Sequence, residues 1–286
     1  MNEENGGYPR NANAFRTSVK SPAAGASVPS EPTDNSVPPG PVGRLGYRCA
    51  PMSQEPASPR LRRAYFECRY GQLHVHNAIP AGGGFDEQTT LICLHASSNT
   101  GRVFLEVSRI LGATRSIYSP DTPGCGESDP PPQQLTVAGY AEAIGDFLDS
   151  MRFRQLDLLG AHSGAAVAAE LAISRPGVVR RVVMVGAPAL DADQRRSYRD
   201  LSAPEGTPRG ALWARAAVID WDADQRLPKV KQPLLVLRPR DNFWEAGARM
   251  AKLLPGARVV DLPDHDRNLL EKAPALVAKQ VAAFLS

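Results

Sequence analysis

The segment from Leu156 to Pro176, LDLLGAHSGAAVAAELAISRP, constrains the fold more than any other part of the chain. A short apolar run ends in a glycine, a His-Ser pair and a second glycine, and an alanine-rich stretch follows. This order predicts a strand that turns sharply into a helix. Such an elbow lifts one side chain to the edge of a sheet, and its strained backbone requires very small neighbours. Gly160, Ala161, Gly164 and Ala165 are small enough.

Short apolar runs alternate with helical patterns in the rest of the chain. An antiparallel hairpin is expected first, with strands at Ala64 to Glu67 and Leu73 to Asn77. A helix is expected at Thr136 to Met151, with Thr136 as its cap. Further strands are expected near Leu91, Ile117, Leu158, Val183, Leu235 and Val259. The alternation predicts an α/β fold, a mostly parallel twisted sheet with helices on both faces.

Residues 1 to 60 differ in composition from everything that follows. They contain ten prolines, few aromatic or branched residues, and no periodicity. Such a stretch cannot bury enough apolar surface to stay ordered, so we predict a disordered extension. An interaction arm is one interpretation. We favour a solvated extension or a start assigned too early, with Met52 as the true start.

The charge and the cysteines exclude several classes of protein. Residues 1 to 63 carry eight Lys/Arg against five Asp/Glu, so the net charge of +3 lies there and the remainder is neutral. A nucleic-acid-binding domain would concentrate Lys and Arg on itself. No apolar run reaches the roughly 18 residues of a membrane span, and no leader pattern is seen. The cysteines, which lack metal-ligand spacing, suggest a cytoplasmic protein with reduced thiols: Cys49, Cys68, Cys93 and Cys125.

Three further motifs stand around the elbow in a fixed order. Thr90 to Ser97 reads TLICLHAS, an apolar run that ends in His-Ala. Ser119 to Pro132 reads SPDTPGCGESDPPP, and Pro233 to Asp241 reads PLLVLRPRD. This order resembles the α/β-hydrolase fold family from about Ala64 to the C-terminus. The three segments resemble the family's oxyanion strand, its Asp-x-x-Gly-x-Gly-x-Ser-Asp loop, and its seventh strand with the acid-bearing loop.

The resemblance implies a single α/β-hydrolase domain over residues 64 to 286, with a short lid at residues 188 to 231. Within the lid, helices are expected at Asp193 to Leu201 and Arg209 to Trp221. Four aromatic residues could line an apolar substrate pocket, or could pack the lid against the core: Trp213, Trp221, Phe243 and Trp244.

The elbow can be placed in two frames. Read as Gly-x-nucleophile-x-Gly, Gly160 to Gly164 puts His162 at the apex. Shifted by one residue, the frame puts Ser163 there and replaces both glycines by alanines. Spacing favours His162, whereas the usual acyl-serine chemistry of the family favours Ser163. Both frames stay open at this stage.

The resemblance implies the other site residues. His265 follows the last strand, where the family places its catalytic histidine, and Asp241 would hold that histidine in the correct tautomer. Backbone N–H groups of Ala96, Ser97 and Ser163 would form the oxyanion hole. Asp241 could instead cap the next helix, and Asp191 is an alternative acid.

Other polar and glycine-rich motifs point to no further group. His95 is expected to pack behind the oxyanion loop. His74 and His76 share one strand face, but two ligands do not make a metal site, so none is expected. Gly82 to Gly84 opens no helix, and Gly124 with Gly126 fits the hydrolase loop, so no cofactor is implied.

The sequence therefore predicts a hydrolase that acts on a small or medium-sized uncharged carbonyl compound, an ester, a lactone or a C–C bond. Its expected partner is a small-molecule substrate, with neither nucleic acid nor membrane. If His162 stands at the apex, two alternatives open: a lyase- or oxygenase-type enzyme that uses His162 and His265, or a small-ligand binder without catalysis.

Overall fold

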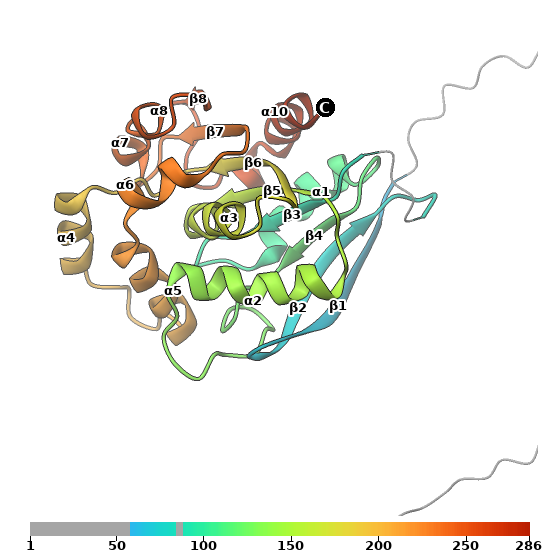
Figure 1. Cartoon of the computed structure of the whole chain (residues 1–286), viewed down its shortest axis with the longest axis horizontal. Helices are drawn as coiled ribbons and strands as arrows, with labels where there is room; N and C mark the ends of the chain where they lie inside the picture. Colours follow the sequence, from blue (N-terminus) through green and yellow to red (C-terminus); the bar gives the residue numbers. More distant parts are fainter. Residues whose placement is uncertain (1–57, 84–87) are drawn as a thin grey trace, which may run out of the picture. The chain divides into compact units, whose positions relative to one another are not determined.

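A twisted eight-stranded sheet organises the part of the chain that the computed structural model describes, residues 58–83 and 88–286. Its strand order is β1-β2-β4-β3-β5-β6-β7-β8 (Figure 1). The strands are β1 (Arg60–Cys68), β2 (Gly71–Ile79), β3 (Leu91–Leu94), β4 (Ile117–Pro120), β5 (Leu156–Ala161), β6 (Val179–Val185), β7 (Leu234–Pro239) and β8 (Arg258–Leu262). β1 and β2 form the expected hairpin, β2 is also antiparallel to β4, and the remaining pairs are parallel. The predicted mostly parallel sheet is confirmed.

Helices cover both faces of this sheet (Figure 1). They are η1 (Gly101–Phe104), α1 (Leu105–Leu111), α2 (Val137–Ser150), α3 (Ser163–Ser174), α4 (Ala192–Asp200), α5 (Arg209–Asp220), α6 (Ala223–Arg226), η2 (Leu227–Lys229), α7 (Trp244–Gly247), α8 (Met250–Leu253), α9 (Leu269–Lys272) and α10 (Pro274–Leu285). Successive residues of β5 point to opposite faces, so Leu158 packs with α2 and α3 while Leu159 packs with α1 and α10. Both faces are therefore apolar, as buried parallel strands require.

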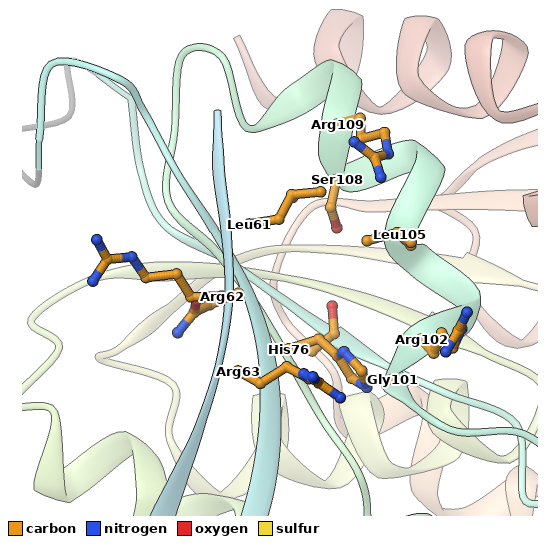
Figure 2. Close-up of a pocket in the computed structure, with 11 residues that line it drawn as sticks. Leu61, Arg62, Arg63, His76, Gly101, Arg102, Leu105, Ser108 and Arg109 are labelled. Carbon is orange, nitrogen blue, oxygen red and sulfur yellow. The ribbon is translucent and has the colours of Figure 1, made fainter. Parts of the chain in front are cut away.

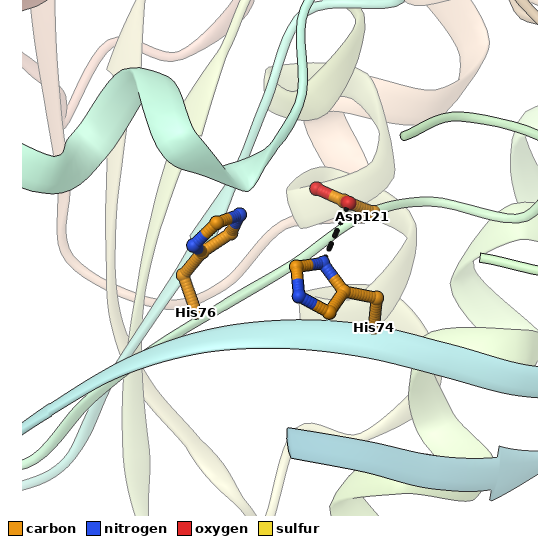
Figure 3. A group of neighbouring side chains, drawn as sticks. All are labelled: His74, His76 and Asp121. Atoms are coloured by element: carbon orange, nitrogen blue, oxygen red, sulfur yellow. Dashed lines mark hydrogen bonds and ion pairs between the residues drawn. The ribbon is translucent and has the colours of Figure 1, made fainter. Parts of the chain in front are cut away.

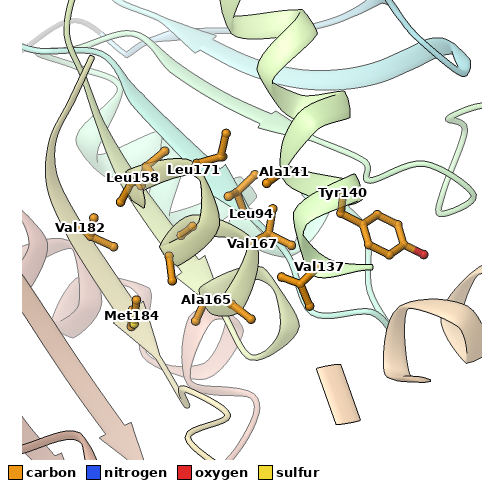
Figure 4. Packing of buried hydrophobic residues seen from close by; sticks show 14 of the residues in the cluster. Leu94, Val137, Tyr140, Ala141, Leu158, Ala165, Val167, Leu171, Val182 and Met184 are labelled. Atoms are coloured by element: carbon orange, nitrogen blue, oxygen red, sulfur yellow. The ribbon is translucent and has the colours of Figure 1, made fainter. Parts of the chain in front are cut away.

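Small residues bring α3 very close to the sheet. Strand residues such as Leu94 and Leu158 pack against its alanine-rich face (Figure 4). A Cβ added to Gly164 would lie 2.0 Å from the backbone oxygen of Leu94, and one added to Gly160 would lie 2.4 Å from that of Gly164. Larger side chains at either glycine would force strand and helix apart, so these glycines fix the elbow's shape.

Several local predictions can be compared directly with the structure. The side chain of Thr136 accepts a hydrogen bond from the Gly139 N–H and caps α2, as expected. Between β6 and β7, α4 and α5 match the two predicted helices within one residue, and α6 and η2 were not predicted. The described cysteines, Cys68, Cys93 and Cys125, are all free. The predicted disorder at the N-terminus and the Met52 start lie outside the described residues, apart from 58–60.

Within the described ranges, the helices are all too short or too polar to cross a bilayer.

Candidate functional site at the elbow

His162 stands at the apex of the turn between β5 and α3. Its backbone has φ 52° and ψ −116°, a conformation that is strained for a residue with a side chain. Its N–H donates to the carbonyl of Val185 at 2.9 Å, and its carbonyl accepts from the N–H of Ala165 at 2.9 Å. Ser163 is already the first residue of α3. The backbone geometry thus favours the frame with His162 at the apex.

The hydroxyl of Ser163 contacts the oxyanion loop. Its Oγ accepts a hydrogen bond from the Ser97 N–H at 2.6 Å. In the described part of the chain, no hydrogen bond links this hydroxyl to a histidine that could remove its proton. The structure therefore brings the predicted oxyanion residue Ser97 to Ser163, but it supplies Ser163 with no base.

Asp241 is the acid that reaches the elbow. Its Oδ2 lies 3.3 Å from Nε2 of His162, and its side chain is fully buried. Its other oxygen, Oδ1, accepts from the Phe243 N–H at 2.8 Å. The next helix, α7, has Phe243 as its N-cap and no side-chain cap, so Asp241 does not cap it as the alternative expectation held, and the carboxylate faces His162 instead of His265. Space for this pair depends on Gly186, where an added Cβ would lie 2.3 Å from Oδ2 of Asp241.

Burial and nearby charges set the protonation of this pair. Burial lowers the pKa of His162, and the neighbouring Asp241 carboxylate opposes that shift. The Arg267 guanidinium is close enough to lower the pKa of both His162 and Asp241, although burial leaves the Asp241 pKa raised overall. A neutral imidazole is therefore favoured at neutral pH, which is the form that can accept a proton.

Arg267 lies near the elbow, and the sequence analysis did not single it out. Its Nη2 lies 3.5 Å from Oγ of Ser98, which places the guanidinium beside the oxyanion loop. The sequence feature that could have pointed to Arg267 is its position two residues after His265, in the same loop.

The structure does not bring His265 to the elbow, contrary to the sequence-based expectation. Its backbone is held by Leu262, whose carbonyl accepts from the His265 N–H, and by the Arg240 N–H, which donates to the His265 carbonyl. The residue lines a surface cavity of about 270 Å³ that no elbow residue lines. Among the described residues, no hydrogen bond, ion pair or ring contact joins it to Asp241, and the histidine that faces that carboxylate is His162.

An aromatic stack covers His162. The Phe243 ring lies 5.4 Å from the imidazole, and Tyr198 of α4 stacks on Phe243 at 5.6 Å. Tyr198 also donates its hydroxyl to the Asn242 carbonyl. The lid thus contacts the elbow through Tyr198, which the sequence analysis did not single out. The helix itself was predicted, but the local sequence does not reveal that it packs over Phe243.

The other three aromatic candidates have packing roles. Trp221 is buried and donates Nε1–H to Glu170 at 2.7 Å. Trp213 and Trp244 each lie against an arginine side chain, Arg209 at 4.1 Å and Arg238 at 4.4 Å from the ring centroid. Of the four aromatic residues, Phe243 alone has a ring contact with His162 among the described side chains.

Two further candidates have structural partners. Asp191 caps α4 in a reciprocal capping box with Gln194, and the acid that faces His162 is Asp241. His95 is buried and donates from Nδ1 to the Ala96 carbonyl, since its Nε2 accepts from the Thr122 N–H at 2.9 Å. His95 therefore packs behind the oxyanion loop, as the sequence analysis expected.

Asp121 joins the two histidines of β2 in one cluster (Figure 3). Its Oδ2 lies 2.9 Å from Nδ1 of His74. The same carboxylate accepts from the Gly101 N–H at 2.6 Å and the Glu127 N–H at 3.2 Å. These bonds anchor the loop after β4 to β2 and provide partners for the buried Asp121 carboxylate.

Comparison with known proteins identifies the family. The model of the alpha/beta hydrolase family matches residues 91–281. The chain therefore belongs to the alpha/beta hydrolase family.

Solved structures share its fold at low sequence identity. A hydrolase from Pseudomonas aeruginosa PA01 superposes with a TM-score of 0.66 at 21% identity, over 79% of this chain and 98% of that one. An esterase from Thermogutta terrifontis gives 0.65 at 15% identity, over 78% and 98%. Uncharacterized proteins of Mycobacterium tuberculosis and Mycobacterium bovis are 27% identical over 122 residues, 43% of this chain. The match spans 36% of those relatives' length.

Proposed function

We propose that the chain is a hydrolase of small or medium-sized carbonyl compounds, esters or lactones, in which His162 rather than Ser163 is the reactive side chain. One observation carries the proposal: the residue with the strained apex backbone is His162, and its Nε2 faces the buried Asp241 carboxylate at 3.3 Å. The family and the esterase and hydrolase neighbours support hydrolysis as the reaction class.

In this proposal His162 acts as a general base. With the hydrogen on Nε2, the nitrogen 3.3 Å from Asp241, Nδ1 of the neutral ring carries the free electron pair and takes a proton from a water molecule. The hydroxide adds to the carbonyl carbon and forms a tetrahedral oxyanion. As the C–O bond to the leaving group breaks, the imidazolium returns the proton to the leaving oxygen. Atoms and charge balance without a covalent enzyme intermediate.

Ser163 contributes to the oxyanion hole in this mechanism. The Ser97 N–H donates to Ser163 Oγ at 2.6 Å. In this proposal the hydroxyl therefore lies where the oxyanion of the tetrahedral intermediate would bind. A bound carbonyl oxygen would take over that donor and receive the Ser163 N–H as a second one. The proposal keeps Ser97 and Ser163 as oxyanion donors and gives Ala96 no separate role. The predicted attack by Ser163 gains no support, because among the described residues no base contacts its hydroxyl. Chemistry shared between His162 and His265 gains no support either, since no contact joins them.

A fluorophosphonate probe tests the proposal. Wild type, Ser163→Ala and His162→Asn are treated and their intact masses are measured, beside p-nitrophenyl ester and lactone assays. We expect hydrolysis without a burst and no stoichiometric adduct on wild type, because no acyl-enzyme forms. A stoichiometric adduct on Ser163 that disappears in Ser163→Ala would restore the serine mechanism. Failure of the wild type on the whole ester and lactone panel would remove the hydrolase proposal itself.

The charges around His162 predict opposite pH shifts for two variants. Arg267→Gln removes a cation that lowers the His162 pKa, so the pKa should rise and the acidic limb of kcat/KM should move up by about 0.5 to 1 pH unit. Asp241→Asn removes an anion that raises this pKa, so the limb should move to lower pH while activity falls. pH–rate profiles of both variants check the sign. Shifts in the same direction would contradict the assignment of His162 as the titrating base.

A further inference from the structure

A cavity that contains none of the elbow residues lies between the β1–β2 hairpin and α1 (Figure 2). Its volume is about 330 Å³. Its lining residues share one property, that none is acidic: Leu61, Arg62, Arg63, His76, Asn77, Gly101, Arg102, Leu105, Ser108, Arg109 and Ser119. None of the residues assigned to the elbow site lines it. The cavity therefore needs its own explanation.

The strand register builds one wall. Arg63 of β1 pairs with His76 of β2, and His76 in turn pairs with Ser119 of β4. Directly opposed residues point to the same face of a sheet, so the three side chains form a row across three strands. Figure 2 shows the Arg63 guanidinium extending toward the His76 ring.

Helix η1 and α1 build the opposite wall. Gly101 lies against Ser119 so closely that an added Cβ would be 2.1 Å from its backbone oxygen. This contact brings Arg102 to the same end of the cavity as His76 (Figure 2). Ser108 and Arg109 of α1 complete the lining. Ser108 and Ser119 are both buried, and the Ser119 side chain also hydrogen-bonds Cys93.

The positive charge of this cavity is largely uncompensated. Arg109 pairs with Glu106, whereas Arg63 and Arg102 form no ion pair within the described residues. The Glu127 carboxyl is bonded to Tyr65, which lowers its pKa, and Arg63 is close enough to lower that pKa further. Asp121 lies behind His76, but it is already engaged by the Gly101 N–H and His74. Arg62 extends from the other face of β1 (Figure 2), so the charge beside His76 comes from Arg63 and Arg102. Burial lowers the pKa of that histidine, and both guanidinium groups lower it further. An anion of more than one charge would be attracted to these two guanidinium groups.

We propose that this cavity binds a soluble small molecule through a phosphate or pyrophosphate group. Guanidinium groups match phosphate oxygens in a bidentate manner, and serine hydroxyls add neutral donors. The volume exceeds that of a phosphate alone and lies at the lower end of ordinary small-molecule sites, so it leaves room for part of the attached molecule. The proposal does not depend on the reaction at the elbow.

Titration with inorganic pyrophosphate tests this site in the full chain. Binding is measured by calorimetry and by the Tm shift, at an ionic strength held constant with NaCl. Arg63→Gln/Arg102→Gln is expected to weaken binding by roughly 10- to 100-fold, because two charge-assisted donors are lost. The control Arg154→Gln/Arg258→Gln removes the same charge from exposed residues outside the cavity and should bind as wild type does.

Three outcomes would overturn the proposal. The first is a wild-type Tm that rises no more with pyrophosphate than with NaCl. The second is equal binding by both double variants, which would reduce the effect to net charge. The third is that the protein adsorbs to phosphatidic acid vesicles but does not bind pyrophosphate. The ligand of the cavity would then be a lipid headgroup and not a soluble small molecule.

Discussion

Replacing His162 by asparagine is expected to lower kcat/KM for a short-chain p-nitrophenyl ester by about 10²- to 10⁴-fold, because the general base is lost. Asparagine tolerates a positive φ better than most residues, so the elbow's backbone at φ 52° should survive the change. Steady-state kinetics measure the loss, and an unchanged Tm shows that the fold is intact.

Two matched variants separate this result from the serine mechanism. Ser163→Ala removes only the hydroxyl that accepts from Ser97, so kcat/KM should fall by less than about tenfold. His265→Asn should leave kcat/KM unchanged, since the residue does not contact the elbow. A loss on Ser163→Ala or His265→Asn as large as that on His162→Asn would contradict the role given to His162.

The sequence predicted the elbow and the strands well because both are encoded locally. Apolar runs such as that at Leu158 are fully buried, and periodicity reports burial. Gly160 and Gly164 were expected because a tight strand-to-helix turn leaves no space for a side chain, and their contacts of 2.4 and 2.0 Å show why.

The apex residue could not be chosen from sequence. The two frames differ by one position, and both His162 and Ser163 carry reactive side chains. What distinguishes them is the backbone: His162 has positive φ, and Ser163 has entered α3. Spacing favoured His162 but the family's usual chemistry favoured Ser163, and the two frames differ only in how β5 meets α3 in three dimensions.

The partners of the apex residue depend on contacts between distant segments. His265 and Arg267 lie in one loop, and only the path of that loop over the sheet determines which side chain acts on the elbow. Tyr198 reaches Phe243 from a lid helix 45 residues earlier in the chain. Asp121 joins His74 because β2 and β4 are neighbours in the sheet. None of these contacts leaves a periodic signal.

Asp157→Asn is expected to destabilise the protein by about 3 to 5 kcal/mol, because it leaves the buried Arg115 guanidinium without its carboxylate. Asp157 is fully buried near the start of β5, the strand that carries His162 at its other end. It accepts two hydrogen bonds from Arg180, at 3.0 and 2.7 Å, and lies 3.7 Å from Arg115. Arg115 is only 2% exposed, and its Nε has no hydrogen-bond partner within the described structure.

Urea unfolding followed by circular dichroism measures the change, and a surface pair provides the control. Asp149 pairs with Arg175 at 2.8 Å but its side chain is 68% exposed, so Asp149→Asn should cost less than about 1 kcal/mol. If the burial of charge is the cause, Asp157→Leu combined with Arg115→Met should recover much of the lost stability, since the buried pair is removed together. Equal losses for Asp157→Asn and Asp149→Asn would show instead that water reaches Asp157, and that β5 does not depend on a buried ion cluster opposite the elbow.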